Sequence, residues 1–208
     1  MRTFLNLLII ILVLFSICFE TYNFVYVDMH PFILNEQSHI TRYIYYYSYF
    51  TVQSNLAVGI SSLILLINPT YSSNWFRLLR IDSIICIVIT CIVYNVMLRD
   101  DDHNLKGIAM FTNEALHVII PFLAVLNWLV FGPRKIPNKK IMITAIIPPL
   151  IYVIYIFIRG YITDLYPYPF LDASKIGLTQ ALLNTGVVVL LFLFLEIILL
   201  YIDKKLAN

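Results

Sequence analysis

The chain has 208 residues, of which 61% are hydrophobic and only 12% are charged, and its formal net charge is +2. Soluble domains contain roughly 45–50% apolar and about 25% charged residues, so this composition excludes an ordinary soluble domain and indicates a chain embedded in lipid. The small net charge gives no reason to expect a nucleic-acid partner. Because one transmembrane helix needs about 20 apolar residues, the chain has room for several spans and none for a separate soluble domain.

Six apolar stretches predict an all-α polytopic membrane bundle of six transmembrane helices, forming a single domain over residues 1–208. The predicted spans are Phe4–Phe19, Tyr49–Asn68, Asp82–Leu98, Asn113–Gly132, Ile141–Arg159 and Leu178–Ile202. The first stretch follows Arg2, as the apolar part of a signal peptide would. No small-x-small cleavage pattern comes after it, so we interpret it as an uncleaved helix.

Lysine and arginine in the connecting segments predict the orientation of the bundle, because these residues are enriched on the cytoplasmic side. Nine of them share a side with both termini: Arg2, Arg77, Arg80, Arg134, Lys135, Lys139, Lys140, Lys204 and Lys205. Five lie on the other side: Arg42, Arg99, Lys106, Arg159 and Lys175. We therefore expect both termini in the cytoplasm. The tyrosines of the first outer loop, Tyr43, Tyr45, Tyr46 and Tyr47, fit an aromatic belt at the membrane interface.

Polar side chains gather where the second and fourth predicted spans begin. Thr51, Ser54 and Asn55 are spaced i, i+3 and i+4, so they share one face of a helix. Asn113 and His117 are likewise four residues apart on the fourth span. Both spans begin on the outer side of the predicted topology, which places all five side chains at a similar depth. An ionisable residue inside a membrane is a functional candidate by default, so His117 makes this layer a candidate site.

This set of residues has the elements of acyl-transfer chemistry. A hydroxyl becomes a useful nucleophile when a base takes its proton, and histidine is the usual base because its pKa is near neutrality. Thr51 is thus the candidate nucleophile, His117 the base, and Asn55 and Asn113 the candidate supporting or oxyanion groups. The alternative is that these polar groups only join helices, as Ser, Thr and Asn do in membrane bundles. The inner halves of the second, fourth and sixth spans carry only Glu196 as a comparable exception.

Three segments of the chain resemble a known family. They are Tyr49-Phe50-Thr51…Asn55-Leu56, Asn113…His117…Pro121 and Tyr168-Pro169-Phe170-Leu171-Asp172. In this order and spacing they resemble the androgen-induced protein family of multipass membrane proteins, and most closely its small bacterial six-helix relatives. Animal members of that family are threonine hydrolases that cleave fatty acid esters of hydroxy fatty acids. The resemblance implies that Thr51 is the nucleophile, that His117 is the base, that the substrate is a membrane lipid or fatty acyl ester, and that the membrane is a bacterial plasma membrane.

The resemblance leaves some roles open. In the family pattern the catalytic threonine stands three residues before the asparagine, whereas Thr51 stands four before Asn55, so Ser54 is kept as a second candidate nucleophile. Arg159 is a candidate to meet a lipid carboxylate, and the loop with Tyr168 and Phe170 is a candidate to contact the substrate.

A non-catalytic protein that binds a lipid or a protein partner is the alternative function. A small transporter is less expected, because Pro148-Pro149 interrupts the fifth span without a matching break in another. We expect no cofactor. No metal site is expected either, because the histidines lack the spacing of metal ligands.

Overall fold

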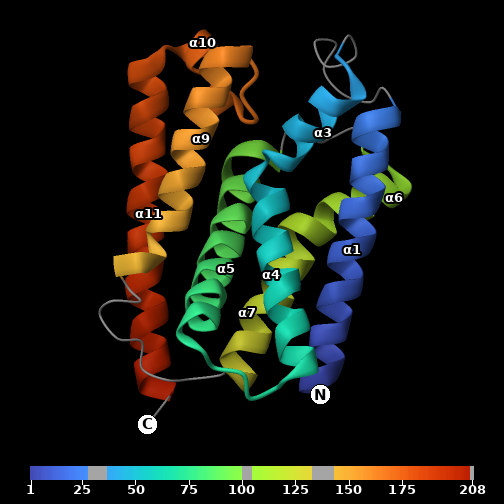
Figure 1. Cartoon of the computed structure of the whole chain (residues 1–208), viewed down its shortest axis with the longest axis vertical. Coiled ribbons are helices and arrows are strands. Elements are labelled where there is room, and N and C mark those ends of the chain that lie inside the picture. The colour runs from blue at the N-terminus through green and yellow to red at the C-terminus, as the bar shows by residue number, and fades with distance from the viewer. Residues whose placement is uncertain (28–36, 100–104, 133–142, 207–208) are drawn as a thin grey trace.

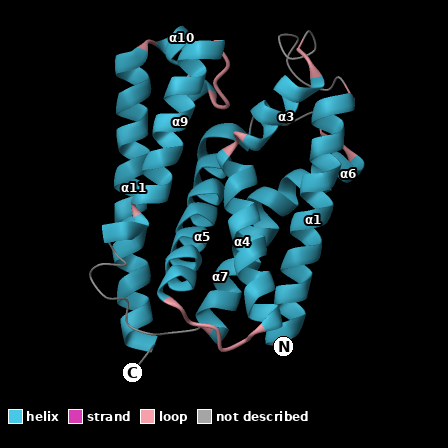
Figure 2. Ribbon diagram, in the orientation of Figure 1, coloured by secondary structure: helices cyan, strands magenta, loops and turns pink. Residues whose placement is uncertain are grey.

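The computed structural model describes residues 1–27, 37–99, 105–132 and 143–206, and these residues form an all-α structure (Figure 2). Six of its helices are long and apolar enough to cross a membrane. They span Arg2–Tyr26, Phe50–Ile67, Asn74–Leu98, Gly107–Phe131, Ile143–Thr163 and Leu178–Leu206. The described residues thus contain the six apolar helices that the sequence predicts, as in an integral multipass membrane protein.

Several of these spans combine more than one helical element. The long helices are α1 (Arg2–Tyr26), α4 (Phe50–Ile67), α5 (Asn74–Val93), α7 (Ile120–Phe131), α9 (Ile147–Thr163) and α11 (Leu178–Leu206). The shorter ones are α3 (His39–Tyr47), α6 (Gly107–Glu114) and α10 (Ala173–Ile176), with the 3-10 turn η4 (Pro169–Leu171). Two segments are π-helical: η1 (Tyr94–Leu98) continues α5, and η3 (Ala115–Ile119) joins α6 to α7.

Helices α1, α4, α5 and α7 pack against one another, and α11 joins them through α5 (Figure 1). The core between them consists of side chains with almost no exposed surface, among them Ile9, Val58, Ile85 and Ile120. Helix α1 begins and α11 ends at the lower end of the molecule as drawn in Figure 1. Helices α3 and α10 lie at the opposite, upper end. The polar layer predicted from the sequence belongs to this upper end.

Several helices begin or end beyond their predicted limits. Helix α1 continues to Tyr26, so Glu20 lies within it and not in a loop. Helix α5 begins at Asn74 and not at Asp82, because the Ser73 side chain caps it by accepting the Phe76 N–H. Arg80, which was predicted in a connecting segment, is therefore buried in the bundle, where its Nη1 donates to Ser61 Oγ at 3.1 Å.

Two further sequence interpretations are corrected. Pro148 and Pro149 stand in the first turn of α9, just after the turn at Ile146, so they interrupt the fifth span (Ile143–Thr163) near its start and not at its centre. Tyr45 and Tyr46 are buried and not exposed at an interface. Their rings pack on Phe24 with centroid distances of 5.9 and 5.3 Å, so they connect α3 to α1.

Candidate functional site

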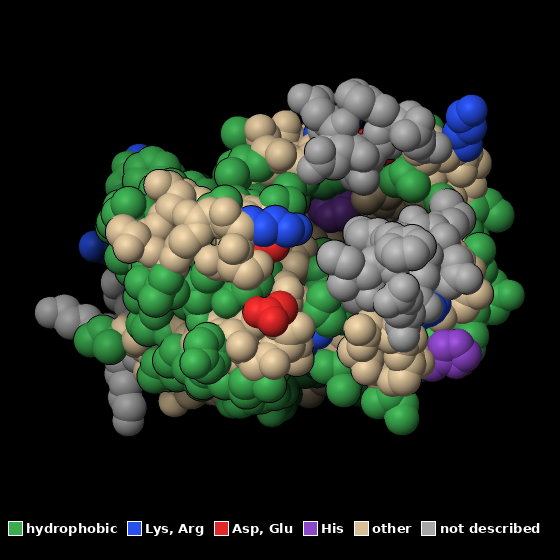
Figure 3. Space-filling model, turned by 90° about the horizontal axis from the view of Figure 1, so that it is seen from above, with side chains coloured by type: hydrophobic (Ala, Val, Ile, Leu, Met, Phe, Trp, Pro, Cys, Tyr) green, Lys and Arg blue, Asp and Glu red, His purple; other side chains and the backbone are tan. Residues whose placement is uncertain are grey.

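Thr51 and His117 meet at the upper end of the bundle. Thr51 lies in the first turn of α4 and His117 in the middle of η3, and Thr51 Oγ1 is 3.3 Å from His117 Nε2. Both side chains line a cavity of about 290 Å³. The upper face is hollowed, and a histidine side chain lies in the hollow (Figure 3). The two residues that the sequence singled out as nucleophile and base are thus within hydrogen-bond reach of each other.

The hydrogen bond at the far side of the His117 ring determines its tautomer. His117 Nδ1 is 2.9 Å from the carbonyl oxygen of Asn113. Because a carbonyl oxygen only accepts, Nδ1 carries the proton and Nε2 presents its lone pair to the Thr51 hydroxyl. This is the tautomer that a general base requires, and the backbone carbonyl takes the place that an aspartate occupies in a serine-protease triad.

The π-helical turn around His117 is held by Asn55. In this turn the Ile120 N–H donates to Ala115 O, one residue further back than in an α-helix. In the same register Leu116 O would accept from residue 121, which is a proline and has no N–H. Asn55 Nδ2 donates to this carbonyl at 3.1 Å and to Thr51 O at 2.8 Å. Both amide hydrogens are therefore engaged, so Asn55 joins α4 to η3 and cannot serve as an oxyanion donor.

The Tyr94 ring packs against one face of the His117 ring. The two rings are stacked with centroids 4.0 Å apart and an interplanar angle of 18°. Asn113 Nδ2 donates to the Tyr94 hydroxyl at 2.6 Å, and the Arg99 guanidinium lies 5.4 Å from the centre of the Tyr94 ring. Asn113 therefore supports the imidazole twice, through its backbone carbonyl and through Tyr94. Sequence reasoning missed Tyr94, because one aromatic residue in an apolar run gives no signal.

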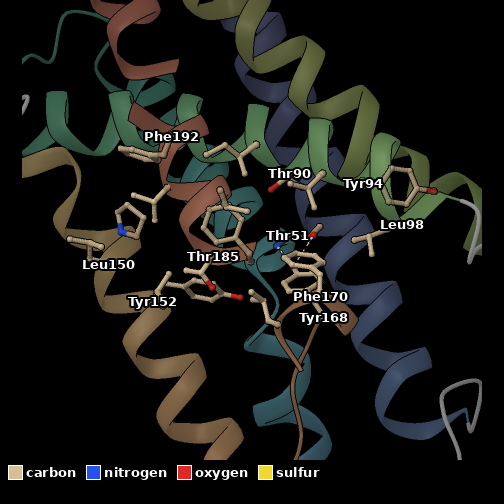
Figure 4. Close-up of a pocket in the computed structure, with 18 of the residues that line it drawn as sticks. Thr51, Thr90, Tyr94, Leu98, Leu150, Tyr152, Tyr168, Phe170, Thr185 and Phe192 are labelled. Atoms are coloured by element: carbon tan, nitrogen blue, oxygen red, sulfur yellow. Dashed lines mark hydrogen bonds between the residues drawn. The ribbon is translucent and has the colours of Figure 1, made fainter. Parts of the chain in front are cut away.

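Tyr168 brings a third polar group to Thr51. Its hydroxyl oxygen accepts the Thr51 N–H at 3.3 Å and lies 3.5 Å from Thr51 Oγ1 (Figure 4). Phe170 stacks on the Tyr168 ring with centroids 5.3 Å apart. Burial raises the pKa of Tyr168, so its phenol stays protonated at neutral pH and can donate a hydrogen bond. The residue predicted to contact substrate is thus close enough to the nucleophile to take part in the chemistry.

The loop that carries Tyr168 is fastened at several points. The Tyr45 hydroxyl donates to Tyr166 O at 2.6 Å, and Asn184 Nδ2 on α11 donates to Phe170 O at 2.8 Å. Asp172 caps α10 by accepting from the Ser174 N–H at 3.2 Å. These contacts with α3, α10 and α11 fix the depth at which the phenol enters the bundle.

A second cavity meets the first at Thr51. It measures about 80 Å³ and lies among α4, α5, α9 and α11, with a lining that is almost entirely apolar (Figure 4). Thr51, Tyr94, Leu98 and Tyr168 line both cavities. Thr51 therefore lies between an apolar cavity and a more polar one.

Ser54 and Arg159 are placed away from the pair. Ser54 Oγ is 2.9 Å from Thr90 Oγ1 and donates to Thr51 O at 3.1 Å, so it is engaged with other groups than His117. Arg159 Nη1 donates to Leu165 O at 3.0 Å, and its guanidinium lies 5.0 Å from the centre of the Tyr45 ring. Neither side chain lines the two cavities at Thr51. Arg159 braces the upper end of α9.

No family model, curated protein or solved structure matches the chain, so the resemblance to the androgen-induced protein family stays a prediction. His30 and His103 lie outside the described residues. Within residues 1–27, 37–99, 105–132 and 143–206, no group of three or more His, Cys, Asp or Glu side chains is arranged to hold a metal ion.

Proposed function

We propose that the protein is an intramembrane hydrolase of lipid esters, in which Thr51 is the nucleophile and His117 the general base. The observation that carries the proposal is the 3.3 Å contact between Thr51 Oγ1 and His117 Nε2, at a threonine that lines two cavities. With both termini in the cytoplasm, as the distribution of Lys and Arg predicts, the pair lies in the outer leaflet half of a bacterial plasma membrane. The resemblance to the androgen-induced protein family agrees with the same two roles.

The first half of the reaction forms an acyl-enzyme. His117 Nε2 takes the proton of the Thr51 hydroxyl as Oγ1 attacks the ester carbonyl carbon, and a tetrahedral oxyanion forms. Tyr168, whose hydroxyl is 3.5 Å from Oγ1, donates a hydrogen bond to this oxyanion. The bond to the alcohol oxygen then breaks, and His117 returns the proton to that oxygen, which releases the alcohol and leaves the acyl group on Thr51.

The second half restores the enzyme with water. A water molecule in the larger cavity gives a proton to His117 and attacks the acyl carbon, and the new tetrahedral oxyanion again meets the Tyr168 phenol. The bond between the carbon and Thr51 Oγ1 breaks, His117 protonates Oγ1, and the carboxylic acid leaves. The polar surface of the 290 Å³ cavity, which includes Asn113 and Glu20, supports the entry of this water.

The apolar cavity supports a lipid as the substrate. Apart from three threonines, its lining consists of aliphatic and aromatic side chains, among them Ile89, Val93, Leu150 and Phe192. An acyl chain in this cavity places its carbonyl carbon at Thr51, while the alcohol portion extends into the larger cavity. Burial of the chain supplies binding free energy of about 0.8 kcal/mol per methylene group.

Covalent labelling tests the proposal. The purified protein in detergent is incubated with a fluorophosphonate, which forms a stable bond with an activated hydroxyl. We expect labelling of the wild type, loss of labelling in Thr51→Ala, and full labelling in Ser54→Ala, whose hydroxyl lies on the same helix but does not contact His117. An unlabelled wild type, or equal labelling of Thr51→Ala, rejects the hydrolase.

The apolar cavity also supports a second function, non-catalytic binding of a lipid. An 80 Å³ apolar space beside Thr51 accommodates part of an acyl chain whether or not the hydroxyl reacts. In that case the wild type binds a fatty acyl ester without cleaving it. Thr51→Ala binds the ester equally well, and neither protein forms a product. Product analysis after incubation with a radiolabelled ester separates the two functions.

A further inference from the structure

The cavity of about 290 Å³ is lined by aromatic rings and one carboxylate. The rings belong to Phe24, Tyr46, Tyr49, Tyr94 and Tyr168, and the carboxylate belongs to Glu20 on α1. Among the described residues that line this cavity there is no Lys or Arg. Positive charge is attracted by a carboxylate and by the faces of aromatic rings, so the part of the cavity lined by Glu20, Phe24, Tyr46 and Tyr49 is suited to a cation. The Tyr94 ring is already stacked on His117 and lies 5.4 Å from the Arg99 guanidinium.

The rings form a continuous wall. Phe24 lies 5.3 Å from Tyr46 and 6.1 Å from Tyr49, and Tyr49 lies 5.5 Å from Tyr168, measured between ring centroids. Each ring is held by its neighbours, and the Tyr168 hydroxyl is held by Thr51. A wall of fixed rings of this kind is how proteins recognise quaternary ammonium groups.

Glu20 adds a carboxylate to the cavity, and Tyr46 adds its ring. The Thr112 hydroxyl donates to one carboxylate oxygen of Glu20, which orients the side chain. The Tyr46 hydroxyl is buried, and no hydrogen-bond partner for it lies among the described residues. Burial and then the negative charge of Glu20 raise the pKa of Tyr46, so the phenol remains neutral.

We infer that this cavity binds an ammonium group carried by the alcohol portion of the lipid ester. The orientation of the bound substrate rests on the proposed function, in which the acyl chain occupies the apolar cavity and the alcohol portion occupies the cavity lined by Glu20. A substrate with a free carboxylate on the alcohol portion meets the negative charge of Glu20 and is disfavoured. Arg159, which the sequence suggested for a lipid carboxylate, does not line this cavity.

Two esters of the same shape test the inference. Hexanoylcholine carries a trimethylammonium group, and 3,3-dimethylbutyl hexanoate carries a neutral tert-butyl group in its place. We expect the wild type to hydrolyse the choline ester with a kcat/KM about tenfold or more above that of the neutral ester. Glu20→Gln should reduce this ratio severalfold. The control is Asp164→Asn, which removes an exposed carboxylate at the same end of the molecule and should leave the ratio unchanged. Residue 164 has a positive φ, which Asn adopts as readily as Asp.

Binding to Thr51→Ala separates the inference from the proposed function. Equilibrium dialysis of the two radiolabelled esters with this variant should show the same preference for hexanoylcholine. If neither ester is hydrolysed by the wild type but the choline ester binds preferentially to Thr51→Ala, the hydrolase is rejected and the ammonium site stands. Equal binding of the two esters, or an unchanged preference in Glu20→Gln, overturns the ammonium site. If Glu20→Gln does not fold, Tyr46→Leu, which removes a ring from the wall, takes its place with the same expected loss of preference.

Discussion

Two polar pairs join helices of this bundle, and they differ in what surrounds them. Near the termini, Asn127 Nδ2 on α7 donates to Asn6 Oδ1 on α1 at 2.6 Å, and both residues are completely buried. At the upper end, Thr51 and His117 are 3.3 Å apart and line a cavity. The chemical types are similar, but only the second pair can be reached by another molecule. Access, more than polarity, therefore separates a candidate site from a contact that holds helices together.

The largest expected effect is the loss of the base. We expect His117→Ala to lower kcat/KM for a fatty acyl ester by about 10³-fold, because Thr51 then has no group to take its proton. Hydrolysis of a chromogenic acyl ester by the purified protein measures this loss. If His117→Ala keeps a tenth or more of the wild-type rate, the imidazole is not the base and the upper pair is no more catalytic than the lower one.

The next effect concerns the donor to the oxyanion. Tyr168→Phe keeps the ring that stacks on Phe170 but removes the hydroxyl beside Thr51, so we expect kcat to fall by about 10²-fold with little change in KM. The matched control is Tyr166→Phe. It removes a hydroxyl from the same loop, at a residue that lines neither cavity at Thr51. A reduction of the same size in both variants would show that the effect comes from the loop and not from the Tyr168 hydroxyl.

The lower pair should change stability and not rate. Asn127→Ala leaves the Asn6 amide buried without its partner, so we expect a loss of about 1–2 kcal/mol in the free energy of unfolding. Thermal unfolding in detergent measures it, and the double variant with Asn6→Ala should lose less than the sum of the single variants. The kcat of the protein that remains folded should equal that of the wild type. A fall in kcat comparable to that of Tyr168→Phe would remove the distinction between the two pairs.

The number of apolar helices could be predicted from the sequence because it depends on local information. The pairing of Thr51 with His117, 66 positions apart, was expected only from the resemblance. Long apolar runs give the helices, and one histidine within such a run is conspicuous. Tyr94 could not be found in this way, because its ring reaches His117 only in the register set by the π-helical turns. The role of Tyr168 depends on how a loop 117 positions away in the sequence returns to α4.

The lower half was harder to predict than the upper half. Glu196 was the one exception expected there, but Asn127 lies in the fourth span and is fully buried against Asn6. A single asparagine in an apolar run gives no sign of its partner, which lies on a helix at the other end of the sequence. Arg80 was assigned to a connecting segment because charge marks the end of an apolar run, whereas the Ser73 cap starts the helix earlier.

The smallest expected effect is a pH dependence of stability that comes from Asp172, in the loop that carries Tyr168. Burial alone would raise the pKa of Asp172, but the hydrogen bonds from Ser174 and the ion pair with Lys175 outweigh it and hold the pKa below its usual value. A carboxylate with a lowered pKa in the folded state stabilises the fold above its unfolded pKa of about 3.9 and loses this contribution as the pH falls through the folded pKa.

Asp172→Asn keeps the cap, because Asn caps a helix as well as Asp does, but it removes the charge. We therefore expect stability to fall by about 0.5 kcal/mol at neutral pH, and by less as the pH falls below about 4. Thermal unfolding of wild type and variant between pH 7 and pH 3 measures the convergence. Lys175→Met, which keeps the cap but removes the exposed partner, should cost much less, because exposed ion pairs contribute little. A gap between wild type and Asp172→Asn that stays constant over this range would mean that the charge of Asp172 does not hold the loop. The position of Tyr168 beside Thr51 would then depend on Tyr45 and Asn184, whose bonds to the loop involve no titrating carboxylate.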